Sequence, residues 1–582
     1  MTLKLKNIII VEKTDDKKEF DSYMISSKFQ TVVKFVLAIV ILSLSFGCET
    51  KNAHKHEYTA VASKKATCTE DGNVLYYECS CGKFFVKNGE NFEENNYDDL
   101  ILPATGHVFD KEIADEKVLA AEATETTART YYKSCACGAF DNENPALTFT
   151  VGKTLSDYEK YDKSFYTPVS LTLSLYDAGN CVYGFTWNTK AEPARPVVRI
   201  CEGDAYGEYV KYGAKYEIAE SYEVGDKKIN YYVCKVEIPL KRDTEYTYTV
   251  GDEYMRTTTE TVTIKTVVPT EKKRWRFSHV SDSQVEGDVT SGGLGTGKAF
   301  AKVLKNVTGK SNNRFMIHTG DVVEYGKYES YWTEMLDKNF NYLSRLPIMA
   351  ISGNHETTYK NGAYETYKHF DYKMPEQYTD LGFYYSFSYG GVKFIMLNTN
   401  RLFADNKLST DQYEWVENEL KTKTEKWTVV CMHNPMYSVG KWGSDPTRNA
   451  ISRALTAQLG GLFAEYKVDL VLQGHDHMVS RTHPIGADGK PAEEKKETSG
   501  GVEYTLNPNG VIYVMNGPAG DQKKDKSSVY PHDESLYEYA ETSEESSWAE
   551  FEVSADSITV YVRNAGSGAV KTTRVWGIKK TA

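Results

Sequence analysis

Six apolar runs with strand character divide the C-terminal half of this 582-residue chain, and they constrain its fold more than any other feature. The runs are Arg276–Val280, Phe315–Ile317, Pro347–Ile351, Val392–Leu397, Thr428–Met432 and Val468–Leu472. Segments with helix-start signals lie between them. Ser409 and Gln412 have the spacing of a capping box, and Asp445-Pro446 is expected to begin a helix that runs to about residue 466. The alternation predicts a layered α/β domain over residues 272–582, with Trp548–Val575 adding the last strands.

Five of the six runs lead directly into a residue that can bind a metal ion. In chain order these residues are Asp282 and Gln284, Asp321, Asn354 and His355, His433, and His475 and His477. Ligands of open α/β sheets bind at the carboxyl ends of the strands. Carboxylate, amide and imidazole groups from five strands are therefore expected to meet at one edge. Gly320, Gly353 and Gly474 allow the chain to turn sharply there.

These blocks, taken in order, resemble the signature of calcineurin-like metallophosphoesterases. The blocks are Asp282-Ser-Gln284, Gly320-Asp321, Gly353-Asn354-His355, His433 and Gly474-His475-Asp-His477. The stretch His433-Asn-Pro-Met-Tyr-Ser438 narrows the likeness to purple acid phosphatases. The resemblance extends over residues 165–582. It implies an α/β (α+β) fold, a β-sandwich flanked by helices, and a metal-dependent hydrolase of phosphoric esters.

The resemblance also implies a role for each residue. Asp321 should bridge two metal ions about 3.5 Å apart. The other expected ligands are Asp282 and His477 for the first ion, and Asn354, His433 and His475 for the second. His355 should lie beside the ions and stabilise the transition state or protonate the leaving oxygen. This mixture of ligands suits iron, zinc or manganese better than calcium.

Two positions depart from the family pattern. Purple acid phosphatases carry Tyr three residues after the bridging Asp, where this chain has Glu324. Tyr325 is one position away and would point in the opposite direction, so the purple tyrosinate–iron colour is not expected. Gln284 stands where other metallophosphoesterases have His. Either Gln284 or Glu324 could complete the shell of the first ion.

Residues 160–268 show a different pattern, with strand-like runs at the spacing of an all-β sandwich. The runs are Val169–Leu175, Cys181–Trp187, Pro196–Cys201, Tyr231–Ile238, Glu245–Val250 and Thr258–Val267. Residues 181–189 and 240–251 look like parts of the fibronectin-III-like domain that precedes the catalytic domain in purple acid phosphatases. We therefore expect such an all-β domain here.

Residues 49–150 contain two degenerate copies of a Cys/His repeat. The first copy has His56, Cys68, Cys79 and Cys81, and the second has His107, Cys135 and Cys137, with Glu125 near the place of the missing Cys. Thiolate and imidazole suit tetrahedral zinc, so one expectation is a structural zinc ion at His56, Cys68, Cys79 and Cys81. A disulfide and free thiols are the alternatives. Similar modules occur on bacterial surface proteins, so residues 54–150 are expected to act as a spacer or to contact the cell wall or surface.

The N-terminal residues 1–48 have the features of an export leader. The apolar stretch Phe35–Phe46 has the length of a signal-peptide core and is short for a membrane span. Cys48 follows it and resembles the lipidation site of bacterial lipoproteins. A simple cleaved signal and an uncleaved anchor are the alternatives, and Met24 is a second candidate for the start. We expect an exported protein, secreted or held at the membrane through Cys48.

The formal net charge of −12 provides no basic face for nucleic acid, so the expected partner is a small phosphate ester. The motifs favour a phosphomonoesterase that acts by attack of a metal-activated water. A phosphodiesterase or nucleotidase on the same site is the main alternative, and the motifs do not separate the two. A catalytically decayed surface-binding protein is a third hypothesis, disfavoured by the intact Asp321, Asn354 and His355.

Overall fold

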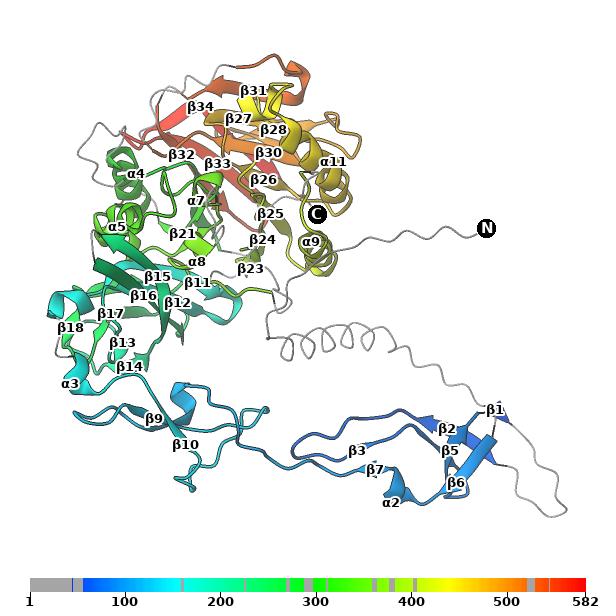
Figure 1. Ribbon diagram of the computed structural model, residues 1–582. Helices are drawn as coiled ribbons and strands as arrows, with labels where there is room; N and C mark the ends of the chain where they lie inside the picture. Colours follow the sequence, from blue (N-terminus) through cyan, green and yellow to red (C-terminus); the bar gives the residue numbers. More distant parts are fainter. Residues whose placement is uncertain are drawn as a thin grey trace, which may run out of the picture. The chain divides into compact units, whose positions relative to one another are not determined.

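The computed structural model describes residues 44–45, 56–89, 91–158, 162–224, 227–267, 269, 273–286, 297–309, 312–357, 364–375, 383–400, 406–520, 529–543 and 545–581 (Figure 1). The chain divides into two compact units, Met1–Ala121 with Thr130–Val151 and Glu122–Arg129 with Gly152–Ala582. Most of the predicted leader, including Cys48, lies outside the described residues. Within them, no helix is long and apolar enough to cross a membrane.

The first unit consists of small sheets built from the two repeats. Its longest sheet has the order β1-β2-β4-β5-β6, and two smaller sheets have the orders β3-β7 and β10-β9-β8. The strands are β1 (Leu44–Ser45), β2 (Glu57–Val61), β3 (Gly72–Asn73), β4 (Tyr76–Cys79), β5 (Phe84–Asn88), β6 (Asn91–Asn95), β7 (Ile101–Leu102), β8 (Leu119–Ala121), β9 (Arg129–Tyr132) and β10 (Thr148–Val151). Aromatic rings pack together in the first repeat, where Tyr58 stacks on Phe92 with centroids 3.9 Å apart.

The predicted zinc group of the first repeat is wrong in one member. His56, Cys79 and Cys81 do lie together, with His56 Nδ1 3.2 Å from Cys79 Sγ and 3.4 Å from Cys81 Sγ. Cys68 lies instead in a cluster with residues of the second repeat, its Sγ 3.4 Å from Cys135 Sγ. The turn that carries Cys68 is hydrogen-bonded to the segment joining the two repeats, which directs this thiol forward along the chain.

In the second unit, the segment before the C-terminal domain is all-β, as predicted. One sheet has the order β11 (Val169–Asp177), β12 (Val182–Thr189), β16 (Lys227–Pro239), β15 (Lys215–Val224). The other has the order β14 (Val210–Gly213), β13 (Pro196–Glu202), β17 (Glu245–Asp252), β18 (Thr257–Thr258), with β19 (Val262–Lys265) also paired to β17. Alternate residues Tyr183, Phe185 and Trp187 of β12 enter one core with Tyr248 of β17, which is the two-residue period of a strand.

Two large mixed sheets form the C-terminal domain, residues 272–582. The eight-stranded sheet has the order β22 (Ile348–Ala350), β21 (Asn313–His318), β20 (Trp275–Val280), β32 (Ser547–Val553), β33 (Ser557–Asn564), β34 (Val570–Lys579), β29 (Val502–Leu506), β28 (Lys495–Ser499). The seven-stranded sheet has the order β23 (Tyr385–Tyr389), β24 (Val392–Met396), β25 (Trp427–Cys431), β26 (Leu470–Gln473), β30 (Ile512–Asn516), β27 (Met478–Thr482), β31 (Tyr537–Thr542). Strands β20, β21 and β22 are mutually parallel, as are β24, β25, β26 and β30. This arrangement confirms the predicted α/β class.

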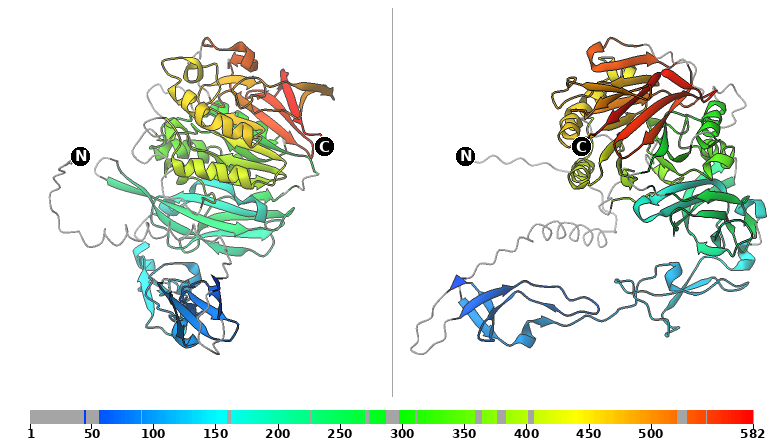
Figure 2. Two further views of the ribbon diagram at one scale, coloured as in Figure 1. Left: turned by 90° about the vertical axis from the view of Figure 1, so that its right-hand side faces the viewer. Right: turned by 180° about the vertical axis from the view of Figure 1, so that it is seen from behind.

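The seven-stranded sheet is buried on both faces. Phe394 and Met396 of β24 join the core shared with the eight-stranded sheet, whereas Ile395 and Leu397 pack in a second core on the opposite face. That second core is covered by α9 (Thr410–Thr422) and α11 (Ala450–Glu465), which lie across this sheet in Figure 2. Burial on both faces accounts for the continuous apolar runs in the sequence, because both sets of alternating side chains must be apolar.

The two predicted helix starts have different outcomes. Ser409 caps α9, its Oγ accepting a hydrogen bond from the Gln412 backbone N–H at 3.1 Å. The second helix, α11, begins at Ala450 and not at Pro446. Asp445 instead caps a separate turn, where its side chain accepts hydrogen bonds from the Thr447 N–H at 2.9 Å and from the Thr447 hydroxyl at 2.8 Å.

Candidate metal centre

The ends of five parallel strands carry the predicted ligands. Asp282 follows β20, Asp321 follows β21, and Asn354 begins the short helix α7 (Asn354–Thr357) after β22. His433 and His475 follow β25 and β26 of the other sheet. The carboxyl ends of the two sheets therefore meet at one site, as the motif order predicted.

The backbone at this site is strained. Asp282, Asp321, His475 and His477 have φ values of 51°, 55°, 75° and 51°. Non-glycine residues rarely adopt this left-handed region, and each such residue costs on the order of 1–3 kcal/mol. Strain of this kind concentrates at functional sites, where the surrounding structure holds it in place. Here it turns each side chain away from its strand and toward the common centre.

His433 is oriented by a backbone carbonyl. Its Nδ1 lies 2.8 Å from the Thr319 carbonyl oxygen, so Nδ1–H donates a hydrogen bond to that oxygen. The lone pair of Nε2 is then free to bind a metal ion. Nε2 is 3.0 Å from Asn354 Oδ1 and 3.3 Å from Asp321 Oδ1. Three electron-rich atoms facing one another in a buried position require a proton or a cation between them. A carbonyl partner on the second ring nitrogen is typical of histidines that bind metals.

The first predicted ion position is outlined by Asp282 and His477. His477 Nε2 lies 3.4 Å from Asp282 Oδ1, and the His475 backbone N–H lies 3.0 Å from both Asp282 carboxylate oxygens. One ligand atom each from Asp321, His433 and His475 lies within 4.8 Å of the others. The six predicted ligands thus form one connected group.

The charges of the group suit cations. Burial disfavours ionisation of Asp321, but the neighbouring His433 and His355 more than offset it and hold the pKa of Asp321 below its usual range. Burial likewise opposes ionisation of Asp282, and His477 reverses the effect and lowers its pKa. Buried carboxylates that remain charged need positive partners. A set of carboxylate, amide and imidazole donors fits iron, zinc or manganese ions.

His355 is held apart from the predicted ligands. Its Nδ1–H donates to the Glu324 carbonyl oxygen at 2.7 Å, and its Nε2 lies 2.9 Å from Gln284 Nε2 and 3.8 Å from Asp321 Oδ2. Burial favours neutral His355, but Asp321 and Glu324 raise its pKa above the usual value. The ring is a quarter exposed, with a side-chain exposure of 25%. It can therefore present a proton to a substrate at the mouth of the site.

Gln284 and Glu324, the two further candidates for the first ion, both contact His355. The Glu324 carboxylate lies 3.5 Å from His355 Nδ1. Gln284 Oε1 is buried and has no hydrogen-bond partner among the described residues. A buried amide oxygen without a donor is unfavourable and fits a role as an additional metal ligand. The structure therefore favours Gln284 over Glu324 for that role.

Sequence reasoning missed Glu356, which is fully buried behind the site. Its Oε2 accepts the N–H groups of Gly353 at 2.7 Å and Asp321 at 2.9 Å, and its Oε1 accepts the N–H of Val323 at 3.1 Å. Burial and the adjacent Asp321 raise the pKa of Glu356 to about 7. Glu356 thus ties together the loops that carry Asp321 and Asn354. Its position directly after Asn354-His355 was the only signal in the sequence.

Gly353 and Gly474 are required by close approach of the chain. A Cβ on Gly353 would lie 2.0 Å from Asp321 Oδ1, and one on Gly474 would lie 2.1 Å from Ser281 Oγ. Neither neighbour can move without displacing Asp321 or the segment that leads to Asp282. Both glycines therefore allow the loops to bring the ligands together.

Trp442, also missed from the sequence, borders the site. Its ring centroid lies 5.1 Å from that of His475, and the indole is partly exposed. The Asp476 carboxylate accepts the N–H groups of Trp442 and Gly443, both at 2.9 Å. Asp476, between two predicted ligands, thus holds the loop that forms one wall of the site. An exposed aromatic ring at this place can contact the organic part of a substrate.

Two strand histidines near the site have structural roles. His279 Nε2 lies 2.9 Å from Thr319 Oγ1 and its Nδ1 lies 2.7 Å from Asn516 Nδ2. His318 Nε2 lies 2.8 Å from Ser283 Oγ. Burial lowers the pKa of His279 to about 3 and that of His318 to about 4, so both rings are neutral and packed.

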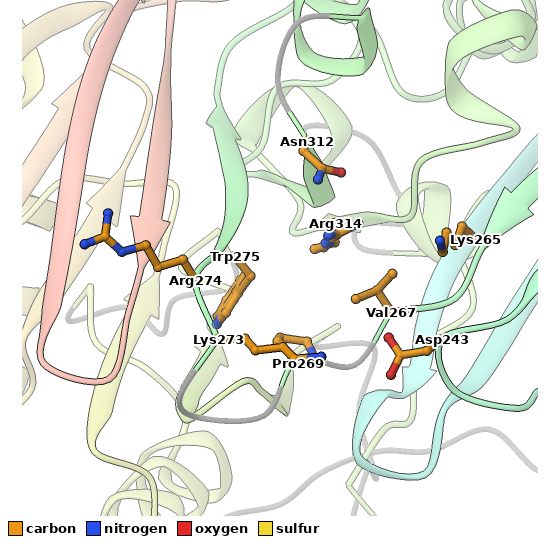
Figure 3. Close-up of a pocket in the computed structure, with 9 residues that line it drawn as sticks. All are labelled: Asp243, Lys265, Val267, Pro269, Lys273, Arg274, Trp275, Asn312 and Arg314. Atoms are coloured by element: carbon orange, nitrogen blue, oxygen red, sulfur yellow. The ribbon is translucent and has the colours of Figure 1, made fainter.

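A cavity of about 300 Å³ lies elsewhere in the second unit (Figure 3). Lys265, Arg274, Trp275 and Arg314 are among its lining residues. Trp275 is the first residue of β20, whose other end leads to Asp282. The cavity is therefore at the opposite end of the strand from the metal centre.

Comparison with known proteins agrees with this geometry. Residues 276–479, which contain all six predicted ligands, match the family described as Calcineurin-like phosphoesterase. The chain is 28% identical over 201 residues to Purple acid phosphatase 15 of Arabidopsis thaliana, covering 33% of this chain and 32% of that protein. It is 26% identical over 323 residues to an uncharacterized protein of Mycobacterium tuberculosis, covering 50% and 58%.

A solved structure has a similar fold. A purple acid phosphatase from yellow lupin (Lupinus luteus) seeds superposes with a TM-score of 0.58 and 19% identity, covering 71% of this chain and 75% of that one. The chain spans from about a third to three fifths of the length of the two curated relatives named. Residues 276–479 thus match a calcineurin-like phosphoesterase domain, and the chain is similar to purple acid phosphatases, which agrees with the resemblance seen in the motifs.

Proposed function

We propose that this protein is an exported phosphatase that hydrolyses phosphate monoesters by attack of a metal-activated water. One observation supports the proposal most strongly. The Asp321 carboxylate lies at the centre of a buried group whose nitrogen and oxygen atoms face one another, with His433 Nε2 3.3 Å away. Two cations in such a site lower the pKa of a water molecule and neutralise charge on the phosphoryl group.

Each residue of the site has a distinct role in the proposed reaction. Asp282, Asp321, Asn354, His433, His475 and His477 are the ligands in this proposal. Glu356 and the Thr319 carbonyl fix Asp321 and His433, which preorganises the site. His355, oriented by the Glu324 carbonyl, protonates the leaving oxygen. Trp442 contacts the organic group of the ester.

The experiment compares p-nitrophenyl phosphate with bis(p-nitrophenyl) phosphate, using protein stripped by a chelator and then supplied with iron, zinc or manganese. We expect metal-dependent hydrolysis that favours the monoester. A preference for the diester would replace the proposal by a phosphodiesterase, and inactivity on both esters with every metal would support a binding protein.

Asp321→Asn provides the matching variant. Loss of the one carboxylate charge that the two ions share should remove most activity and also reduce metal content. Unchanged metal occupancy in Asp321→Asn would contradict the bridging role of this residue. Asp411→Asn, at an exposed position of α9, serves as the control.

Export rests on the leader pattern and is tested separately. The apolar stretch Phe35–Phe46 and the following Cys48 favour a lipid-anchored surface protein. Cys48→Ala should release the protein from the membrane fraction and abolish incorporation of labelled palmitate. Equal membrane retention of the wild type and the variant would contradict the lipid anchor.

A further inference from the structure

The two repeats of the first unit build the same cysteine turn. In the first, the Gly82 N–H donates to the Cys79 carbonyl at 2.8 Å, and in the second the Gly138 N–H donates to the Cys135 carbonyl at 2.8 Å. Both glycines have left-handed φ values, 83° and 86°. The two thiols of each Cys-x-Cys turn therefore point to the same side as the histidine that begins the repeat.

Two hydrogen bonds place Cys68 near the next repeat. The Thr105 N–H donates to the Thr67 carbonyl oxygen at 2.9 Å, and the Ala104 N–H donates to the Asp71 carboxylate at 2.7 Å. These bonds fasten the turn that contains Cys68 to the segment just before His107. Cys68 is thereby delivered to the second copy rather than to its own.

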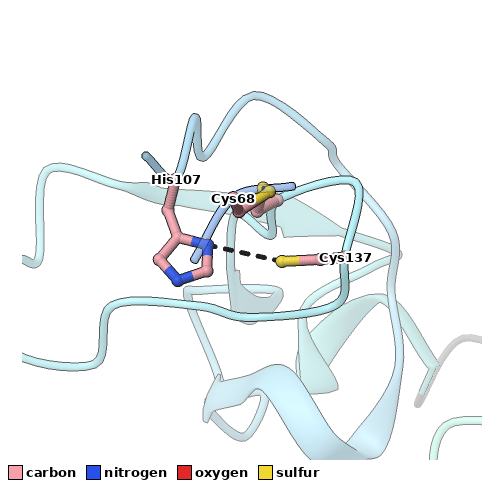
Figure 4. A group of neighbouring side chains, drawn as sticks. Cys68, His107 and Cys137 are labelled. Atoms are coloured by element: carbon pink, nitrogen blue, oxygen red, sulfur yellow. Dashed lines mark hydrogen bonds between the residues drawn. The ribbon is translucent and has the colours of Figure 1, made fainter. Parts of the chain in front are cut away.

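The result is a group of four soft ligands. One atom each from Cys68, His107, Cys135 and Cys137 lies within 4.8 Å of the others. Cys68 Sγ is 3.4 Å from Cys135 Sγ, and Cys137 Sγ is 3.3 Å from His107 Nδ1. Figure 4 shows the His107 ring directed at Cys137, with Cys68 beside them. Tetrahedral zinc with ordinary bond lengths separates its ligand atoms by about 3.6–3.8 Å, close to these distances.

We infer that Cys68, His107, Cys135 and Cys137 bind a structural zinc ion that joins the two repeats. Three thiolates and one neutral imidazole form a closed tetrahedral set without an open position, which is the arrangement of structural zinc sites. Repeats this short bury little apolar surface, and small domains of this kind commonly depend on metals for stability.

The turn geometry explains why the second repeat lacks a third cysteine. Thr67 and Thr124 form matching turns, in which each threonine Oγ1 accepts an N–H three residues later, from Glu70 and Thr127, at 3.0 Å. Glu125 occupies the place of Cys68 in the second turn. The cysteine of this turn serves the following repeat, and no further copy follows residue 150. Glu125 instead contacts the Tyr254 hydroxyl at 3.4 Å, and both residues belong to the second unit.

The test measures zinc bound to the full chain after metal removal under reducing conditions and reconstitution. Cys68→Ser and Cys137→Ser should each lose about one zinc ion per chain, and the double variant should lose no more than either single variant. When cobalt replaces zinc, each single variant should lose the same absorption band, the one that arises from charge transfer between thiolate and cobalt. Hydrolysis of p-nitrophenyl phosphate should persist in all of them, which shows that the catalytic domain is folded.

Matched controls decide between this site and its alternatives. Cys201→Ser, in the all-β segment, should retain all zinc, since the Cys201 thiol lies 3.1 Å from the Asp204 carbonyl oxygen of its own loop and is outside the Cys/His groups of the two repeats. Cys81→Ser is also combined with Cys68→Ser. If each single variant lost one zinc ion and this double variant lost no more than one, the site would belong to the first repeat alone. A Cys68–Cys135 disulfide in native protein, found by non-reducing peptide mass spectrometry without zinc, would also overturn the inference.

Discussion

Replacing Glu356 by alanine or by glutamine measures how strongly one buried carboxylate holds the metal centre together. Alanine leaves three buried N–H groups, those of Asp321, Val323 and Gly353, without an acceptor. Each unsatisfied donor costs about 1–3 kcal/mol, so Glu356→Ala should destabilise the catalytic domain by roughly 3–9 kcal/mol. The free energy of unfolding of a typical domain is about 5–15 kcal/mol, so the expected loss is a large part of the total stability.

Glutamine should cost much less. Its single oxygen can replace Oε2, which accepts two of the three bonds, and only the Val323 N–H then loses its acceptor. The expected loss is about 1–3 kcal/mol, a third of the alanine effect. The pKa of Glu356 is raised to about 7, so near neutral pH this side chain carries less negative charge than an ordinary glutamate. Replacing it by neutral glutamine therefore changes the local charge less.

The assay is urea unfolding followed by tryptophan fluorescence, with hydrogen exchange of peptides that contain residues 321–323 and 353. Exchange should accelerate there first, and more for alanine than for glutamine. Glu414→Gln, at an exposed position of α9, is the control and should change stability by less than about 0.5 kcal/mol. A loss below about 1 kcal/mol for Glu356→Ala, or an equal loss for both variants, would refute the reasoning.

Two further predictions concern the acid and the pH dependence of stability. His355→Ala should lower kcat by about 10²–10⁴-fold with metal content unchanged, and loss of metal measured by elemental analysis would show that His355 is a ligand. Burial raises the pKa of Asp337 from 3.8 to about 6, so the folded state keeps a proton that the unfolded chain releases. The stability that this proton contributes is present below pH 3.8 and is lost as the pH rises to about 6. Asp337→Asn, whose amide oxygen can still accept the Ser170 N–H, should therefore raise the unfolding free energy by about 1–2 kcal/mol at pH 8, after a discount for partial exposure, and by little near pH 4; an equal gain at both values would contradict this origin.

The sequence predicted those features whose signal is local. Apolar runs buried on both faces, such as Val392–Met396, were recognised as strands, and the ligands at their ends followed from the motifs. Strands β14 and β15 were missed because one side of them is polar and exposed, for example at Lys211 and Glu217. Glu356 and Trp442 were missed because their importance arises from backbone groups and rings contributed by distant loops. Their one-dimensional context does not distinguish them from ordinary surface residues.

Cys68 was assigned to the wrong partners for a related reason. Proximity along the chain favoured His56, Cys79 and Cys81, which belong to the same sequence repeat. The pairing was decided by two hydrogen bonds from the backbone N–H groups of residues 104 and 105, one to the Asp71 carboxylate and one to the Thr67 carbonyl oxygen, which no composition or spacing reveals. The Cys and His residues of the repeats identified which side chains could bind zinc, whereas the turn geometry determined which of them lie together.

The forward placement of Cys68 makes the metal-binding module out of phase with the sequence repeat. A recombination breakpoint just before His107 would separate Cys68 from His107, Cys135 and Cys137. A breakpoint before Cys68 would keep the four zinc ligands together. An array that grew by duplicating the segment from Cys68 to His107 would gain one crosslink per added copy. Its length could then change in evolution without leaving an unmatched thiol at either junction.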